Sequence, residues 1–189
     1  TAVDCALDLR AARGWSAPDV SRVVTRVDIE TYGPGYEIVK QHNPTTPYQA
    51  KFSLAYCVAA ALLEGELTLD QFGPERFGPE GVRDPAIAAL LSRIHVGVAD
   101  ECTRAYPGAW PARVAITTAD GAVDRRASDY PRGNAENPVS TDALIEKCRA
   151  LVASRFGDDR ARSAVAALST MADAGDIATV FASMGHWSA

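Results

Sequence analysis

The sequence predicts an α+β fold, with an antiparallel sheet of about four strands that is covered by one long helix and followed by an all-helical C-terminal tail. Three observations predict it. A capped helix signal precedes a hairpin signal between two strand-like runs, and strand patterns disappear near residue 139. The chain therefore divides into an α+β unit, residues 1–139, and a helical unit, residues 140–189.

The chain begins with a predicted helix and a predicted strand. Small and apolar residues from Ala2 onward indicate a helix that ends by Gly14, because glycine commonly follows a helix C-terminus. From Val20 to Tyr32, polar and apolar residues then alternate. This period is typical of a β-strand with one wetter face.

The clearest helix signal follows a polar loop. Thr46 can serve as the N-cap and Gln49 stands three residues later, so the two form a capping box. Pro47 suits the first helical position. We predict one continuous helix from Pro47 to about Glu64, with Gly65 as its C-terminal stop.

A short helix and three strands complete the α+β unit. Asp84 and Pro85 form an N-cap and first-position pair, which predicts a helix through Leu91. Asp120 and Gly121 give a strong hairpin signal between two strand-like runs. The strands are expected at Ile94–Val98, Ala112–Thr118 and Ala122–Asp129.

The C-terminal unit is predicted to be helical throughout, because only helical spacing of apolar residues follows residue 139. Helices are expected from Ser140 to about Val152, from Asp158 or Asp159 through Met171, and from Asp176 to a segment that carries Met184.

Charge, hydropathy and cysteine spacing exclude several classes of protein. The net charge of −5 and the lack of a basic run argue against a nucleic-acid partner. The longest apolar stretch, Leu54–Leu63, is too short to span a membrane. The first residues mix acids and bases, unlike a signal peptide. Four widely spaced cysteines stand at no metal-ligand spacing, so we expect reduced thiols, no metal and a cytoplasmic protein.

Three stretches resemble one known family. They are TAVDCALDL at residues 1–9, NPTTPYQAKFSLAYCVAAALLEG at residues 43–65, and PRGNAENP at residues 131–138 with LIEKC at residues 144–148. The second is long and specific, and all three occur in the expected order. On these residues the chain resembles the C-terminal part of the MmgE/PrpD family, the 2-methylcitrate dehydratase group.

The resemblance implies a two-domain protein. Residues 1–139 look like the family's smaller α+β lid domain, and residues 140–189 look like C-terminal helices that return to complete a large helical domain. A histidine and a lysine of the family's active site would stand just upstream of Thr1. We therefore expect an N-terminal helical domain, on the same or a separate chain, as a partner, and a homo-oligomer.

The resemblance also implies the activity: a lyase of the 2-methylcitrate dehydratase type, a hydro-lyase of propionate catabolism that acts on a small polycarboxylate. No cofactor is expected, because the sequence holds no glycine-rich phosphate loop or cluster of metal ligands. Related members isomerise or decarboxylate similar acids, and a non-catalytic lid or assembly module is the alternative from another class.

The first candidate for a catalytic residue is Tyr56, which matches the family's active-site tyrosine. A phenol is neutral at pH 7 and can donate to a carboxylate or protonate a leaving group. On a continuous helix, Gln49 and Ser53 share its face and are candidates for substrate binding. A core tyrosine with a satisfied hydroxyl is the alternative.

Further candidates are a histidine, a lysine and an arginine. His42 could be a general base, Lys51 stands in the first turn of the predicted helix, and Arg132 could clamp a carboxylate. The alternative for each of them is an ordinary surface residue. We interpret His95 and His186 as structural or incidental.

Overall fold

The computed structural model describes residues 1–183, so Met184 and His186 lie outside the described residues. The chain divides into two compact units, Thr1–Asn137 and Pro138–Ala189, which we call unit 1 and unit 2. Within the described residues, no helix has the length and apolar character needed to cross a membrane. The fold class is α+β, as predicted.

Unit 1 is built on a four-stranded sheet in the order β4-β1-β5-β6. The strands are β1 (Val24–Thr31), β4 (Ile94–Val98), β5 (Ala112–Thr118) and β6 (Val123–Ser128). The predicted number of strands and the β5–β6 hairpin are confirmed. The predicted antiparallel sheet is wrong in one pair, because β4 runs parallel to β1. A parallel pair needs a long crossover connection, and the helices between these two strands supply it.

The first two helices precede strand β1 in the sequence. Helix α1 (Ala2–Arg13) ends at Gly14, whose φ of 61° is left-handed, as predicted. Helix α2 (Ala17–Val23) occupies the start of the segment expected to be a strand, so that prediction is wrong before β1. The cause is a reciprocal capping box between Ser16 and Asp19, which starts a helix before the strand.

The predicted long helix is two helices. Helix α4 (Pro47–Lys51) is capped by Thr46, and helix α5 (Leu54–Glu64) ends at Gly65, as expected. The chain breaks between them because Ser53 takes an extended conformation and forms a β-bridge with Lys40. Further unpredicted elements are α3 (Gly33–Val39), α7 (Asp100–Ala105) and a small hairpin of β2 (Phe77–Gly78) and β3 (Gly81–Val82).

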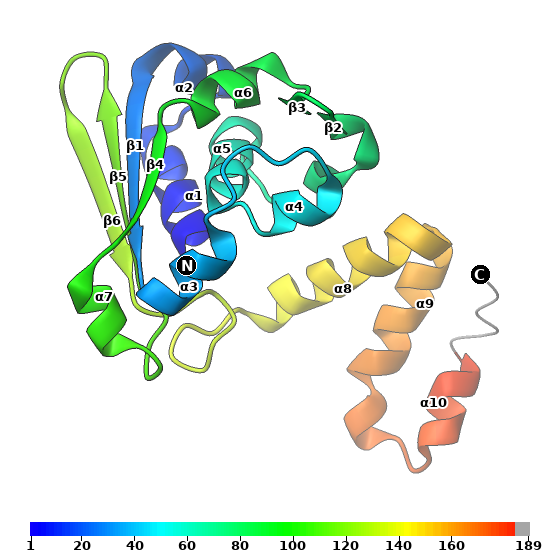
Figure 1. Cartoon of the computed structure of the whole chain (residues 1–189). Helices are drawn as coiled ribbons and strands as arrows, with labels where there is room; N and C mark the ends of the chain where they lie inside the picture. The colour runs from blue at the N-terminus through cyan, green and yellow to red at the C-terminus, as the bar shows by residue number, and fades with distance from the viewer. Residues whose placement is uncertain (184–189) are drawn as a thin grey trace. The chain divides into compact units, whose positions relative to one another are not determined.

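Within unit 1, residues 1–137, the helices α1, α2 and α5 lie on one face of the sheet (Figure 1). Helix α5 is the central one, since nine of its eleven residues are buried. It packs with α1, α2 and α6 (Pro85–Leu91), and α6 begins at the predicted cap Asp84. The core between these layers includes Val27, Ile29, Val58, Leu62 and Ile116.

Unit 2 is helical, with α8 (Thr141–Phe156), α9 (Asp158–Ser169) and α10 (Ile177–Ser183). Ser140 caps α8 as predicted, whereas Gly157 rather than an aspartate occupies the N-cap position of α9. Helix α8 buries no residue, and α9 buries only alanines. Large apolar side chains of the unit remain exposed: Leu144, Leu151, Leu168, Met171, Ile177 and Phe181.

Candidate active site

Tyr56 stands in the first turn of α5 and is fully buried. The turn is fixed by Ser53, whose Oγ accepts a hydrogen bond of 3.1 Å from the backbone N–H of Tyr56. The ring packs against Phe77 at 5.3 Å and Phe72 at 6.0 Å between centroids. Its hydroxyl donates to the backbone carbonyl of Gln71. Hydrogen bonds therefore hold Tyr56 both at its backbone N–H and at its phenolic oxygen.

The acceptor of the Tyr56 hydroxyl is itself held by a polar network. The Gln71 side chain donates to Glu64 Oε2 at 2.9 Å and accepts from the backbone N–H of Thr68 at 2.6 Å. Arg76 donates two hydrogen bonds to the Glu64 carboxylate, at 2.6 and 3.1 Å. Hydrogen bonds thus connect the C-terminal end of α5 with the segment that contains Gln71 and Arg76.

Burial raises the pKa of Tyr56 to about 12, although the nearby Arg76 guanidinium opposes the shift. Burial also pushes the pKa of Glu64 upward, but hydrogen bonds from Arg76 and Gln71 outweigh it and leave that pKa below its usual value. At neutral pH the site therefore holds a protonated phenol beside an ionised carboxylate and a guanidinium. A neutral phenol is chemically a proton donor.

Gln49 and Ser53 do not share a helical face with Tyr56, because the chain breaks at Ser53. Gln49 Oε1 accepts from the backbone N–H of Thr45 at 2.8 Å. Ser53 is buried and also donates to the carbonyl of His42 at 3.4 Å. The hydrogen bonds of these two side chains therefore stabilise the N-terminal ends of α4 and α5.

Among the described residues, no hydrogen bond or ion pair joins the side chains of the other candidates to the phenol. His42 is exposed, with Nε2 at 3.1 Å from the carbonyl of Leu91. Lys51 is exposed at the end of α4. The backbone N–H of Arg132 donates to Asp4 at 3.1 Å, and its residue lines a different hollow of about 350 Å³. Hydrogen bonds of the described residues connect the backbone N–H of Tyr56 with Ser53 and, through it, with the backbone carbonyl of His42, but not with Lys51 or Arg132.

Sequence reasoning missed Gln71, Glu64 and Arg76. Two of them, Glu64 and Arg76, also line a hollow of about 800 Å³, with α2 and α6 on its other sides. Gln71 and Arg76 lie in a turn-rich segment without periodicity and contact Glu64 at the end of α5. No spacing rule would therefore have identified these residues from the sequence. The four cysteines are free thiols, and no group of three metal-ligand side chains occurs within residues 1–183.

Comparison with known proteins matches residues 1–171 to the MmgE/PrpD C-terminal domain. Among curated proteins, the chain is similar to the cis-aconitate decarboxylase of Mus musculus, with 23% identity over 162 residues, covering 86% of this chain and 31% of the relative. The cis-aconitate decarboxylase of Homo sapiens is 24% identical over 157 residues, covering 83% and 30%. The chain thus spans about a third of the length of these relatives.

Proposed function

Since this chain belongs to the MmgE/PrpD family, we propose that it is part of a cofactor-independent lyase acting on a small polycarboxylate, with Tyr56 as a proton donor. The observation that carries the proposal is the phenol itself. Its pKa of about 12 keeps it protonated at neutral pH. By resemblance to the family we assign it to the position of the active-site tyrosine.

The first candidate reaction is dehydration of the 2-methylcitrate type. A base takes a carbon-bound proton, the adjacent hydroxyl leaves, and Tyr56 supplies the proton that turns that hydroxyl into water. For this step the phenol exchanges its bond to the Gln71 carbonyl for one to the substrate. A role in propionate catabolism follows if 2-methylcitrate is the substrate.

Decarboxylation is the second candidate, and the names of the two curated relatives support it. In that reaction a carbon–carbon bond breaks, carbon dioxide leaves, and the electron pair left on carbon takes a proton from a donor such as Tyr56. An isomerase would use the same donor to return a proton to carbon. The three reactions need the same donor but different substrates.

We propose that turnover also needs an N-terminal helical domain, supplied by the same or a separate chain, which carries further groups for the carboxylates and the base. The exposed helices of unit 2 support this. Leu168 is 41% exposed and Phe181 58% exposed. Full burial of one such side chain contributes about 1.5–3 kcal/mol, so a covering domain would gain several such contributions. A cytoplasmic location, expected from the cysteines, belongs to the same proposal.

A non-catalytic lid is the competing function from another class. Tyr56 is fully buried and its hydroxyl already has an acceptor, as a purely structural tyrosine would. Under this alternative, α4 and α5 serve closure of a ligand site whose reacting groups all lie elsewhere.

Turnover of two substrates separates these possibilities. The 189-residue chain is assayed with 2-methylcitrate and with cis-aconitate, alone and together with the helical domain of the family. We expect no turnover by the chain alone and turnover of one acid by the combination. Turnover of neither acid by the complete enzyme would contradict the lyase, and turnover by the chain alone would contradict the need for a helical domain.

A further inference from the structure

A guanidinium is fixed beside the hydrogen-bond acceptor of Tyr56. Arg76 ends the short 3-10 helix η2 (Pro74–Arg76), which follows the turn that carries Gln71. Its two terminal nitrogens donate to the two oxygens of the Glu64 carboxylate, at 2.6 and 3.1 Å. Glu64 also accepts from the Gln71 side chain at 2.9 Å. Two parallel bonds to one carboxylate fix the plane of the guanidinium as well as its position.

The same guanidinium acts on the Tyr56 hydroxyl. Burial raises the pKa of Tyr56, and the charge of Arg76 and its hydrogen bonding with the phenol both oppose that rise. The hydroxyl gives its own proton to the Gln71 carbonyl, so the lone pairs on its oxygen are left for a donor. A carbonyl and a cation therefore both act on the phenolic oxygen.

Proton donation by a buried phenol creates a charge that burial disfavours. When the proton leaves, a phenolate remains, and an unpaired anion in the core is costly. A cation that is already in place stabilises this anion without any rearrangement during the reaction. Glu64 has the opposite charge effect and raises the pKa of Tyr56, yet its two bonds hold Arg76 in place.

We propose that Arg76 is a positioning residue for proton donation, which acts through Tyr56 by stabilising the phenolate, while Glu64 holds the guanidinium. This inference rests on the proposed function, because it needs Tyr56 as the donor. In dehydration, the O–H bond of Tyr56 breaks and a new O–H bond forms on the leaving hydroxyl; in decarboxylation, the new bond is to the substrate carbon. The electron pair stays on the phenolic oxygen, and water returns the proton before the next turnover.

Variants of the complete enzyme test whether Arg76 acts through Tyr56. Arg76→Gln should lower kcat by about tenfold or more with KM within about twofold of the parent, because Arg76 does not touch the substrate. Arg76→Lys keeps the charge without the fork and should recover part of the loss. In the Tyr56→Phe background, Arg76→Gln should change kcat by less than about twofold, because the hydroxyl on which it acts is absent.

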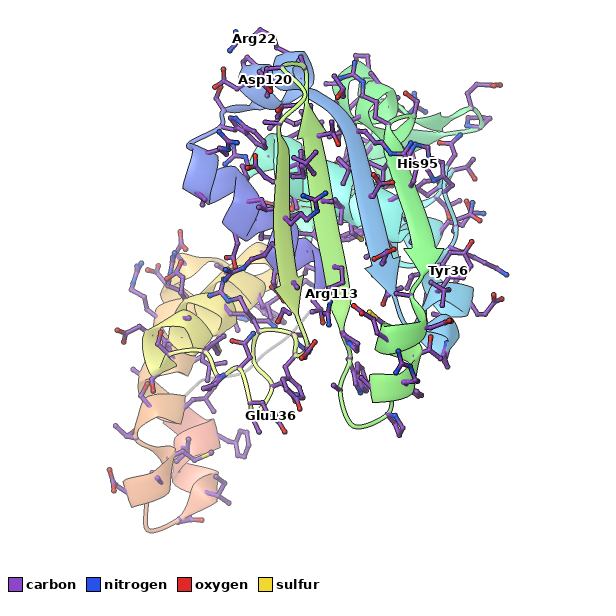
Figure 2. The ribbon with its side chains drawn as sticks, turned by 90° about the vertical axis from the view of Figure 1, so that its left-hand side faces the viewer. Arg22, Tyr36, His95, Arg113, Asp120 and Glu136 are labelled. Atoms are coloured by element: carbon purple, nitrogen blue, oxygen red, sulfur yellow. The ribbon has the colours of Figure 1, made fainter. Side chains whose placement is uncertain are left out.

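Arg113→Gln is the matched control. Arg113 belongs to β5 in the sheet (Figure 2) and is also paired with carboxylates, Glu101 at 3.3 Å and Asp129 at 3.0 Å. Its side chain is 31% exposed, against 26% for Arg76. Among the described residues, no hydrogen bond or ion pair joins Arg113 to Tyr56. Arg113→Gln should therefore leave kcat at the parental value.

A spectroscopic measurement on the 189-residue chain needs no turnover. The ultraviolet absorbance of phenolate is followed at alkaline pH, with Tyr56→Phe subtracted to isolate Tyr56 and circular dichroism to confirm the fold. The Tyr56 phenolate should appear at higher pH in Arg76→Gln, which removes a cation beside the phenol, than in the parent. It should appear at lower pH in Glu64→Gln, which removes an anion.

The outcomes separate this inference from the proposed function. Parental kcat in a folded Arg76→Gln enzyme, or an equal loss of kcat with and without the Tyr56 hydroxyl, would overturn the role of Arg76 and leave Tyr56 as the donor. An unshifted phenolate in Arg76→Gln would overturn it as well. Arg76→Met, which keeps an apolar stem, replaces Arg76→Gln in every measurement if the latter does not fold. Parental kcat in Tyr56→Phe would instead overturn the proposed function itself, and the role of Arg76 with it.

Discussion

At the scale of single residues, Tyr56 combines a buried aromatic ring with a hydroxyl group that needs a hydrogen-bond partner. Its ring is part of the core, between Phe72 and Phe77, and its hydroxyl is a polar group with one backbone acceptor. The network of Gln71, Glu64 and Arg76 fixes that acceptor. The same contacts would stabilise a structural tyrosine and orient a catalytic one, so stability and turnover have to be measured separately.

The shifted pKa of Tyr56 has a consequence for stability at high pH. Because its folded pKa of about 12 exceeds the reference value of 10.0, folding favours the protonated phenol. The stabilisation is complete below pH 10 and is lost as the pH rises toward about 12. At about 1.4 kcal/mol per pKa unit, the loss is on the order of 2 kcal/mol.

Urea unfolding across this pH range checks it. The Tyr56→Phe variant has no hydroxyl to ionise, so its free energy of unfolding should fall less steeply between pH 10 and 12 than that of the parent. The buried Cys57 thiol is present in both proteins and its contribution cancels. Parallel curves for the two proteins would contradict the assigned shift.

The sequence singles out Tyr56 as a candidate residue but does not predict the residues that surround it. The tyrosine stands in a stretch that resembles a known family, and its helix has local cap signals. Gln71 and Arg76 reach it from a segment of short turns, and nothing in their spacing distinguishes them from surface residues. Contacts of this kind depend on how the chain folds back, which a local pattern does not contain.

At the scale of elements, the break at Ser53 decides the geometry of the site. The Ser53 side chain caps α5, and the Ser53 backbone forms a β-bridge with Lys40. Since Ser53 is fully buried, removing its hydroxyl leaves the Tyr56 N–H without its acceptor. The element most important for the site therefore begins at a single buried cap.

Ser53→Ala should lower the free energy of unfolding by about 1–2 kcal/mol. Thr46→Ala, which removes the exposed cap of the five-residue α4, should cost about half as much or less. Chemical unfolding of both variants measures the difference. Equal losses would show that burial of the Ser53 cap does not matter.

Local signals also explain which elements were predictable. The hairpin of β5 and β6 has a turn glycine with φ of 85°, and α6 has an aspartate cap, so both were found. The strand expected from Val20 was wrong at its start, because a capping box four residues upstream outweighs the alternating pattern. The direction of β4 was wrong because strand pairing is decided by connections far along the chain.

At the scale of the whole molecule, the two units differ in how they are stabilised. Unit 1 has a continuous apolar core between its helices and one face of its sheet. The described helices of unit 2 bury mainly alanines and leave their larger apolar side chains in solvent. The proposed helical domain would cover these larger apolar side chains, which would explain why unit 2 carries them on its surface.

Removal of metal ions tests the proposed chemistry of the complete enzyme. Because the mechanism assigns proton transfer to side chains, activity should survive dialysis against EDTA with less than about a twofold change. A control with added Mg²⁺ or Zn²⁺ should give no gain. Loss of activity on chelation that one divalent ion restores would contradict a cofactor-independent lyase.

The most direct test of the account is the turnover of Tyr56→Phe in the complete enzyme, beside Tyr48→Phe as a matched control. Tyr48 is in the same segment but 72% exposed, so its hydroxyl has no expected role. If Tyr56 donates the proton, kcat should fall about 10²-fold or more in Tyr56→Phe, while Tyr48→Phe retains parental kcat. Parental turnover by a folded Tyr56→Phe enzyme would contradict the central claim and leave Tyr56 a structural residue.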